Sequence, residues 1–358
     1  MPHRRHPTRR HRRRPPRLLL IPSWARSANR VSENALLEVK DLKKHFPIKG
    51  GIFRKTVGQV HAVDGVSFTL QPGETLGLVG ESGCGKSTLG RTIIRLYDVT
   101  AGSMKFQGSD ITNAEGEDLR PVRRNMAMIF QDPYASLNPR MTVSEIIEAP
   151  MAVHNKGIKS ERREKIADLL EVVGLRAKMA NRYPHEFSGG QRQRIGIARA
   201  LILQPKLIIA DEPVSALDVS IQAQVINLMM QLKDQFKLTY IFIAHDLAVV
   251  EHISTTVAVM YLGHIMEKAS SKALYANPKH PYTQALIQAI PIADPKKRKA
   301  AGEKQTLQGD IPSPITPPSG CVFHTRCPLA EERCKSEVPA LRNLGENGGE
   351  HLVACHLV

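Results

Sequence analysis

Residues 80–88 read GESGCGKST, and they lie between an apolar run at residues 75–79 and a helix-compatible run at residues 89–96. Glycines in this pattern allow the chain to wrap with its backbone N–H groups pointing inward, as in a loop that cradles phosphates. The lysine places its charge between β- and γ-phosphates, and the following serine offers a hydroxyl to Mg²⁺. We therefore predict a nucleoside triphosphate site formed by one continuous segment: Gly80, Glu81, Ser82, Gly83, Cys84, Gly85, Lys86, Ser87 and Thr88.

The positive charge of the chain is concentrated at one end. The 358 residues carry a net charge of +16, and residues 1–30 contain ten Arg and no Asp or Glu, which leaves +6 for residues 31–358. A segment rich in Arg, His and Pro cannot bury enough apolar surface to fold, so we predict a disordered basic tail over residues 1–35. The tail could contact nucleic acid or anionic lipid, but we favour the interpretation that translation starts near Val31.

Short apolar runs alternate with helix-compatible segments from residue 36 to about residue 270. Three of these runs lie at residues 75–79, 207–210 and 240–244. Their Ile, Leu and Val content and their polar boundaries indicate strands buried on both faces of a parallel sheet. Between residues 141 and 190 the spacing becomes helical, and Gly174 is placed to end one helix. We predict an α/β fold over residues 36–270, with a mixed or parallel sheet as its core and a helical subdomain at about residues 141–190.

The composition changes after residue 270. Residues 271–308 predict a helix followed by a linker rich in Pro, Lys and Gly. Residues 309–358 predict a small module rich in Pro and Cys. The main motifs occur once, which indicates a single nucleotide-binding unit. No stretch approaches the roughly 18 apolar residues of a membrane-spanning helix, so a role at a membrane would require partner subunits.

Two acidic residues end the run LIIADE at residues 207–212. Asp211 could bind Mg²⁺ through water, and Glu212 could polarise the water that attacks a γ-phosphate. Such a pair is weakly specific alone, but together with a phosphate loop it indicates hydrolysis of the triphosphate.

A second glycine motif, FSGGQRQR at residues 187–194, predicts a turn that opens a helix. Ser188 and the N–H groups of Gly189 and Gly190 would form an anion site at the helix N-terminus. A purely structural helix cap would need the serine but not two glycines and Gln191, so we favour a contact with a γ-phosphate.

With this motif the chain resembles the ATP-binding cassette family, whose signature is a Ser-Gly-Gly-Gln turn. The resemblance implies that Gln131, in FQDP, contacts Mg²⁺ and the attacking water, and that His245 contacts the γ-phosphate. Asp218, in SALD, would couple two cassettes. Phe46, in KKHF, would stack on adenine, although a core position is an open alternative. The resemblance also implies that two cassettes close head to tail, with each ATP between one phosphate loop and the partner's signature turn.

The segments after the cassette are similar to those of dipeptide and oligopeptide importers. The similar segments are NPKHPYTQALIQAIP at residues 277–291, GDIPSPITPPSG at 309–320 and CVFHTRCPLAEERC at 321–334. The resemblance is closest to the F-type ATPase subunit of these importers and implies ATP hydrolysis that drives peptide import. It further implies a homologous D-type ATPase or a second copy as the other cassette, two permease subunits and an extracytoplasmic peptide-binding protein. The expected location is the cytoplasmic face of the inner membrane.

Two other functions stay open. Nickel importers share much of this pattern, so the transported substrate could be nickel. A cassette ATPase that acts on nucleic acid, with the Arg-rich tail as its contact, is the alternative outside transport. Such proteins tend to fuse two cassettes or insert long coiled coils, and because neither occurs here we expect no specific nucleic-acid partner.

Four cysteines at the end of the chain form a Cys-x5-Cys-x6-Cys-x20-Cys series: Cys321, Cys327, Cys334 and Cys355. Disulfides are disfavoured in the cytosol, and the spacing lacks the Cys-x2-Cys knuckle common in zinc sites. Four thiolates also suit a [4Fe–4S] cluster, which the family resemblance favours over zinc or free thiols. His324, His351 and His356 could substitute as ligands, whereas Cys84 in the phosphate loop is assigned no metal role.

Overall fold

The computed structural model describes residues 35–51, 55–290, 309–345 and 349–358. Residues 1–34 of the predicted basic tail, including the start proposed near Val31, lie outside the described residues. The predicted linker at residues 291–308 also lies outside them.

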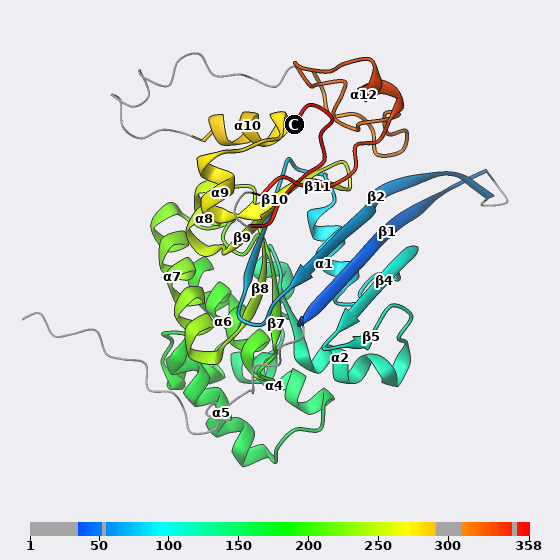
Figure 1. Cartoon of the computed structure of the whole chain (residues 1–358). Helices are drawn as coiled ribbons and strands as arrows, with labels where there is room; N and C mark the ends of the chain where they lie inside the picture. The colour runs from blue at the N-terminus through cyan, green and yellow to red at the C-terminus, as the bar shows by residue number, and fades with distance from the viewer. Residues whose placement is uncertain (1–34, 52–54, 291–308, 346–348) are drawn as a thin grey trace, which may run out of the picture.

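An eight-stranded sheet in the order β11-β12-β10-β9-β3-β8-β7-β6 forms the centre of the molecule (Figure 1). Its parallel strands are β3 (Thr75–Val79), β6 (Met126–Ile129), β7 (Leu207–Asp211), β8 (Thr239–Ile243) and β9 (Thr256–Tyr261). Its antiparallel strands are β10 (His264–Ser270), β11 (Arg342–Asn343) and β12 (His351–Val353). Every residue of β3, β7 and β8 is buried, as their continuous apolar runs predict.

A second, antiparallel sheet lies beside the first in the order β2-β1-β4-β5. Its strands are β1 (Leu37–Gly50), β2 (Lys55–Leu70), β4 (Ala101–Phe106) and β5 (Ser109–Asp110). Helix α1 (Lys86–Ile93) packs between the sheets, because Leu89 and Ile93 share one core with residues such as Leu37 and Ile241. This antiparallel sheet was not predicted from the sequence.

The predicted helical subdomain is formed by α4 (Val143–Val153), α5 (Lys159–Val172), η3 (Ala177–Asn181), η4 (Pro184–Glu186) and the first part of α6 (Gly189–Leu201). Buried Ile166, Leu169 and Leu170 share one face of α5. The chain turns at Gly174, whose φ of 79° is unfavourable for residues with a side chain. The predicted end of this helix is therefore confirmed.

The remaining helices connect the strands and extend toward the C-terminus. They are η2 (Gly116–Asp118), α2 (Leu119–Asn125), α3 (Pro133–Ser136), α7 (Val219–Phe236), α8 (Leu247–Ile253), α9 (Ser271–Ala276), α10 (Pro281–Gln288) and α12 (Arg333–Ser336). No described helix is both long and apolar enough to cross a bilayer.

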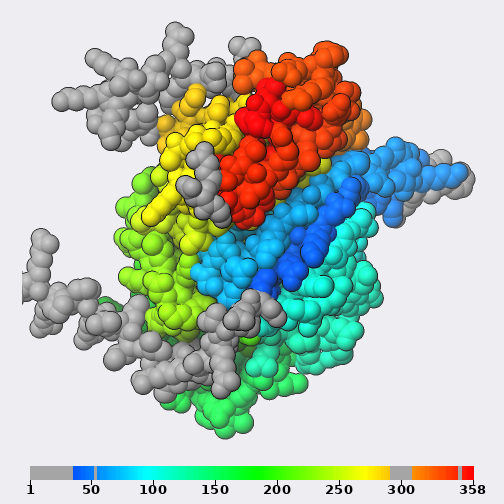
Figure 2. Space-filling model, viewed as in Figure 1, coloured from blue at the N-terminus to red at the C-terminus, as the bar shows by residue number. Residues whose placement is uncertain are grey.

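The segment with the four cysteines, residues 309–358, is called the cysteine module below. Figure 2 shows it as the orange and red surface next to the blue hairpin of β1 and β2. The backbone N–H of His61 in β2 donates to the carbonyl of Pro314 at 2.9 Å. Strand β12 pairs with β10, so the module also contributes to the central sheet.

Candidate nucleotide site

The loop after β3 has a conformation that requires glycine at two positions. Gly80 has φ of 148°, and a Cβ there would lie 2.1 Å from the carbonyl oxygen of Met260. Gly85 has φ of 103°, and its Cβ would lie 2.0 Å from the carbonyl oxygen of Ala62. Because neither backbone neighbour can move aside cheaply, a side chain at either position would open the loop.

The N-terminus of α1 offers donors for an anion. Gly85 is its N-cap residue and provides no side-chain cap, so the first N–H groups of the helix face the loop. Lys86 is 5% exposed, and its Nζ donates to the carbonyl oxygens of Gly80 and Glu81 at 2.8 and 2.9 Å. The loop therefore combines backbone donors with one buried cation, a combination that suits the phosphates of a nucleotide.

Two oxygen groups meet beside this helix. The hydroxyl of Ser87 donates to Oδ1 of Asp211 at 2.6 Å, and the Asp211 side chain is fully buried at the end of β7. Arg91 approaches the other carboxylate oxygen at 3.4 Å. A hydroxyl and a carboxylate are hard oxygen ligands, so Ser87 and Asp211 have the chemistry that would hold Mg²⁺.

Three of the predicted site residues converge at one edge of the sheet. Nε2 of Gln131 donates to Oε2 of Glu212 at 2.7 Å, and Nδ1 of His245 lies 3.7 Å from the same oxygen. The convergence follows from topology, because β6, β7 and β8 are parallel neighbours and these residues follow their carboxyl ends. Glu212 has φ of 47°, a strained conformation for a non-glycine residue that directs its side chain toward this edge.

Phe46 lies in β1 and is half-buried, so the alternative of a core phenylalanine is wrong. Its ring contacts Tyr97 edge to face with a centroid distance of 5.3 Å, and Nζ of Lys44 lies 4.9 Å from its centroid. The ring is partly accessible, as stacking on a base requires, and that role stays a prediction.

The signature turn has structural functions that the sequence analysis missed. Ser188 accepts a hydrogen bond from the N–H of Gln191 at 3.4 Å, and the Gln191 side chain accepts one from the N–H of Ser188 at 3.0 Å. The pair is a capping box, so the argument that a structural cap would not need Gln191 is wrong. A Cβ on Gly190 would lie 2.5 Å from Cγ2 of Ile221 in α7, so this glycine also permits close packing.

Ser188 and Asp218 are both exposed. Gly189, the residue after Ser188, packs near the residue that precedes Asp218. A Cβ on Gly189 would lie 3.4 Å from Cδ2 of Leu217, the residue before Asp218. Asp218 is the N-cap residue of α7 but makes no side-chain capping bond. Its carboxylate is thus available to a second molecule, as the predicted coupling of two cassettes requires.

The structure brings the four C-terminal cysteines together. All four are free thiols, and each of them interacts electrostatically with the other three. Burial raises the pKa of Cys321 to about 11 and raises those of Cys327 and Cys355. Burial thus opposes ionisation, so a cation at the centre of the group would be needed to hold four thiolates.

The cysteine arrangement is wider than a mononuclear site. Among the described residues, no three cysteine sulfur atoms lie within 4.8 Å of one another. Four sulfurs around one zinc ion lie about 3.8 Å apart, given Zn–S bonds of about 2.3 Å. A cubane cluster binds each cysteine through a different iron and accommodates a wider set.

The three histidines considered as substitute ligands each have another partner. Nε2 of His351 lies 2.6 Å from Oε1 of the buried Glu267, and Nδ1 of His324 lies 2.9 Å from the carbonyl oxygen of Cys321. Nε2 of His356 lies 3.0 Å from the carbonyl oxygen of Glu337. The cysteines therefore remain the better ligand set.

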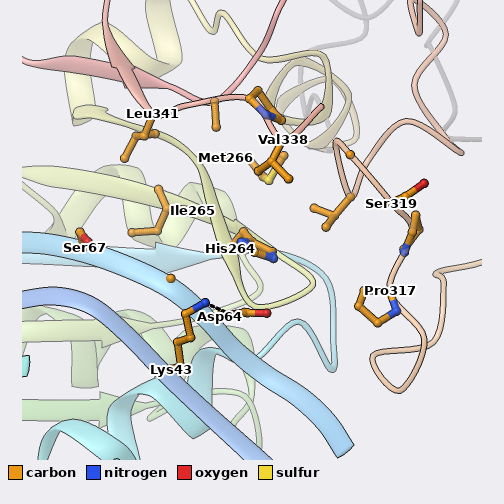
Figure 3. A pocket seen from close by; sticks show the side chains of 16 residues that line it. Lys43, Asp64, Ser67, His264, Ile265, Met266, Pro317, Ser319, Val338 and Leu341 are labelled. Atoms are coloured by element: carbon orange, nitrogen blue, oxygen red, sulfur yellow. Dashed lines mark ion pairs between the residues drawn. The ribbon is translucent and has the colours of Figure 1, made fainter. Parts of the chain in front are cut away.

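A cavity of about 520 Å³ lies between β2, β10 and the cysteine module (Figure 3). Lys43 and Asp64 form an ion pair of 3.0 Å on one wall, and Ile265, Met266 and Leu341 line another. Burial alone would raise the pKa of Asp64, but hydrogen bonds from Lys43 and His61 lower it.

Two histidines join this ion pair in a cluster that sequence reasoning missed. The ligand atoms of His45, His61 and Asp64 lie within 4.8 Å of one another. Lys43 already neutralises Asp64, so we interpret the group as an ion-pair cluster and assign no metal to it. The pairing of β1 with β2, in which His45 lies opposite His61, brings its members together, and only this pairing could have revealed the cluster.

Comparisons with known proteins identify the class to which this site belongs. Residues 63–215 match the family model described as ABC transporter, and residues 266–334 match the model described as oligopeptide/dipeptide transporter, C-terminal region. The chain belongs to the ATP-binding proteins of the ABC transporter family and is an ATPase of this type.

Particular relatives match about nine tenths of this chain. The oligopeptide transport ATP-binding protein AppF of Bacillus subtilis is 59% identical over 91% of this chain and 98% of its own length. OppF of Escherichia coli, also named an oligopeptide transport ATP-binding protein, is 54% identical over 91% of this chain and 98% of its length. A solved structure of the cassette MJ0796, a dimer bound to ADP and Pi, has a TM-score of 0.59 and 26% identity. The structural match covers 66% of this chain and 98% of the MJ0796 chain.

Proposed function

We propose that this chain hydrolyses ATP to drive the import of di- and oligopeptides. Support comes from the nucleotide site and from the C-terminal segment that follows it in the same chain, whose family model bears the peptide-transporter name. Residues 36–270 would bind and hydrolyse ATP, and residues 309–358 would form a separate functional module. The partners would be a second cassette, two permease subunits and an extracytoplasmic peptide-binding protein, at the cytoplasmic face of the membrane.

The convergence of Gln131, Glu212 and His245 carries this proposal. When bound, Mg²⁺-ATP supplies the γ-phosphate that water attacks. Lys86 would hold the β- and γ-phosphates, and Ser87 and Asp211 would hold the ion. Glu212 would accept a hydrogen bond from the attacking water, because its carboxylate is the only acidic group in this cluster. Gln131 and His245 would orient that water and the γ-phosphate.

The partner cassette would complete the site. Exposed Ser188, with the N–H groups of Gly189 and Gly190, would contact the γ-phosphate bound by the other chain. Asp218 would transmit closure between the two copies. Two states, closed with ATP and open after hydrolysis, would then move the permease subunits.

Replacing Glu212 with Gln tests the hydrolytic part of this proposal. The amide keeps the hydrogen-bonding geometry but cannot accept a proton, so turnover should fall by about 100-fold or more while ATP binding is retained. Glu251→Gln on α8, an exposed carboxylate outside the site, serves as the control. Unchanged turnover in the Glu212 variant would remove this residue from the assigned role.

Uptake by cells tests the substrate. Cells whose only copy carries Glu212→Gln should lose uptake of a labelled tripeptide and retain uptake of radioactive nickel. Loss of nickel uptake alone would contradict the peptide assignment and favour a nickel importer.

We also propose that Cys321, Cys327, Cys334 and Cys355 hold a [4Fe–4S] cluster. The wide arrangement of the sulfurs supports it, and backbone N–H groups already point at them, as that of Leu357 does at 3.4 Å from Sγ of Cys355. Anaerobically purified protein should contain iron and sulfide, Cys334→Ser should lose both, and Cys84→Ala should retain both. Zinc without iron would overturn the cluster assignment.

A further inference from the structure

Every polar group of Glu81, inside the phosphate loop, has a hydrogen-bond partner. Its N–H donates to the hydroxyl of Tyr282 at 2.9 Å, and its carbonyl accepts from Nζ of Lys86 at 2.9 Å. Its carboxylate accepts two hydrogen bonds from Arg326, at 2.6 and 3.1 Å. Two of the three side-chain partners, Tyr282 and Arg326, lie 201 and 245 positions from Glu81 in sequence.

Arg326 belongs to the cysteine module. It lies in the turn between Cys321 and Cys327, and its N–H donates to the carbonyl of Phe323 at 3.0 Å. Its side chain is only 6% exposed, and the guanidinium lies 5.8 Å from the ring centroid of Tyr261. A bidentate pair with a buried guanidinium and a partly exposed carboxylate is a directional contact, and pairing with Glu81 raises the pKa of Arg326.

One aromatic cluster fixes both contacts to Glu81. Phe323 is fully buried, and its ring centroid lies 5.3 Å from that of Tyr261 and 5.3 Å from that of Tyr282. Tyr282 contributes the hydroxyl that binds the N–H of Glu81. The position of the Cys321–Cys327 turn therefore determines how the phosphate loop is held.

Charge gives this contact a direct effect on nucleotide binding. A carboxylate in a phosphate loop repels a triphosphate, and the repulsion is strong because the surroundings exclude much of the water. Arg326 cancels that charge and holds the side chain in place. Without Arg326, Glu81 would keep its negative charge and would be free to move toward the phosphates.

We propose that Arg326 is a positioning residue for the phosphate loop, through which the cysteine module sets the affinity of the cassette for ATP. The proposal rests on the nucleotide site and is independent of the imported substrate.

Kinetics of the Arg326→Ala variant of the full-length chain test this proposal. Loss of the pair should raise KM for ATP about tenfold, the equivalent of about 1.4 kcal/mol, and change kcat less than about twofold. Arg326→Lys keeps the charge but only one hydrogen bond, so its KM should lie between those of the wild type and the Ala variant. Lys335→Ala removes a cation from an exposed pair with Glu332 in the same module and should leave KM unchanged.

A double-mutant cycle separates positioning from general damage to the fold. In a Glu81→Gln background, Arg326→Ala should change KM less than about twofold, because no carboxylate remains to be neutralised. Titration with a fluorescent ATP analogue should give the same pattern for the dissociation constant. An equal rise of KM in both backgrounds, or no rise in either, would overturn the proposal. Because the readout is ATP affinity, a failure to import peptides would leave this result interpretable.

Discussion

Replacing Phe323 with Ala should destabilise the protein by about 4 kcal/mol, since truncating a buried Phe typically costs about 3–5 kcal/mol. The structure places this variant in the upper part of the range, because the ring is 0% exposed and contacts the rings of Tyr261, Tyr282 and His280. Aromatic pairs of this kind contribute about 0.5–1.5 kcal/mol each beyond the buried area. Urea unfolding monitored by far-UV circular dichroism should show a lower midpoint for the variant than for the wild type, with an unchanged m-value.

Two control variants show whether the loss of stability comes from the buried ring. Phe323→Leu keeps most of the apolar volume and should cost about 1.5 kcal/mol. Val338→Ala, at a residue of the same module that is 72% exposed, should change the free energy of unfolding by less than about 0.5 kcal/mol. If Phe323→Ala costs less than about 1 kcal/mol, the ring does not anchor the module, and the reasoning that connects the module to Glu81 fails with it.

Two further predictions concern the loop and pH. Gly85→Ala should abolish binding of a fluorescent ATP analogue while the chain remains folded, because the new Cβ would lie 2.0 Å from the carbonyl oxygen of Ala62; retained binding would contradict the described loop. Burial lowers the pKa of His280 from 6.5 to about 4. Between pH 6.5 and pH 4, His280 is therefore protonated in the unfolded chain and neutral in the folded chain. The free energy of unfolding should therefore fall as pH drops from 6.5 toward 4, by at most about 1.4 kcal/mol per pH unit. His280→Asn retains a side-chain acceptor for the N–H of Tyr282 and should show a smaller loss between pH 7 and pH 5; equal losses would exclude His280 as the source.

The parts of the fold that sequence predicted are those defined by local pattern. The strands at residues 75–79 and 207–211 are buried on both faces, so each appears in the sequence as a continuous apolar run. Gly174 ends its helix through its own conformational freedom. The motifs of the nucleotide site are equally local, because each follows one strand or opens one helix.

The parts that sequence did not predict depend on contacts between distant segments. Strands β1 and β2 are long and mostly half-exposed, and the alternation of buried apolar residues is confined to short stretches such as Val66, Phe68 and Leu70, so it does not reveal the whole antiparallel sheet. Glu81 and Arg326 are 245 positions apart in the sequence, and no local sequence pattern predicts their contact. Gln191 is a different case, because the capping-box spacing of Ser188 and Gln191 is visible in the sequence and by itself predicts a structural role.

Strand β12 has a consequence for how the molecule is made. Residues 351–353 pair with β10 and lie two residues before Cys355, so the central sheet gains this strand only once synthesis has passed residue 353. A product that stops short of residue 351 would leave the backbone groups of β10 open along that edge, ready to join the edge of another molecule. Chains that lack residues 351–353 would thus be prone to aggregation, and cellular proteases could distinguish them from chains that contain β12 by that exposed edge.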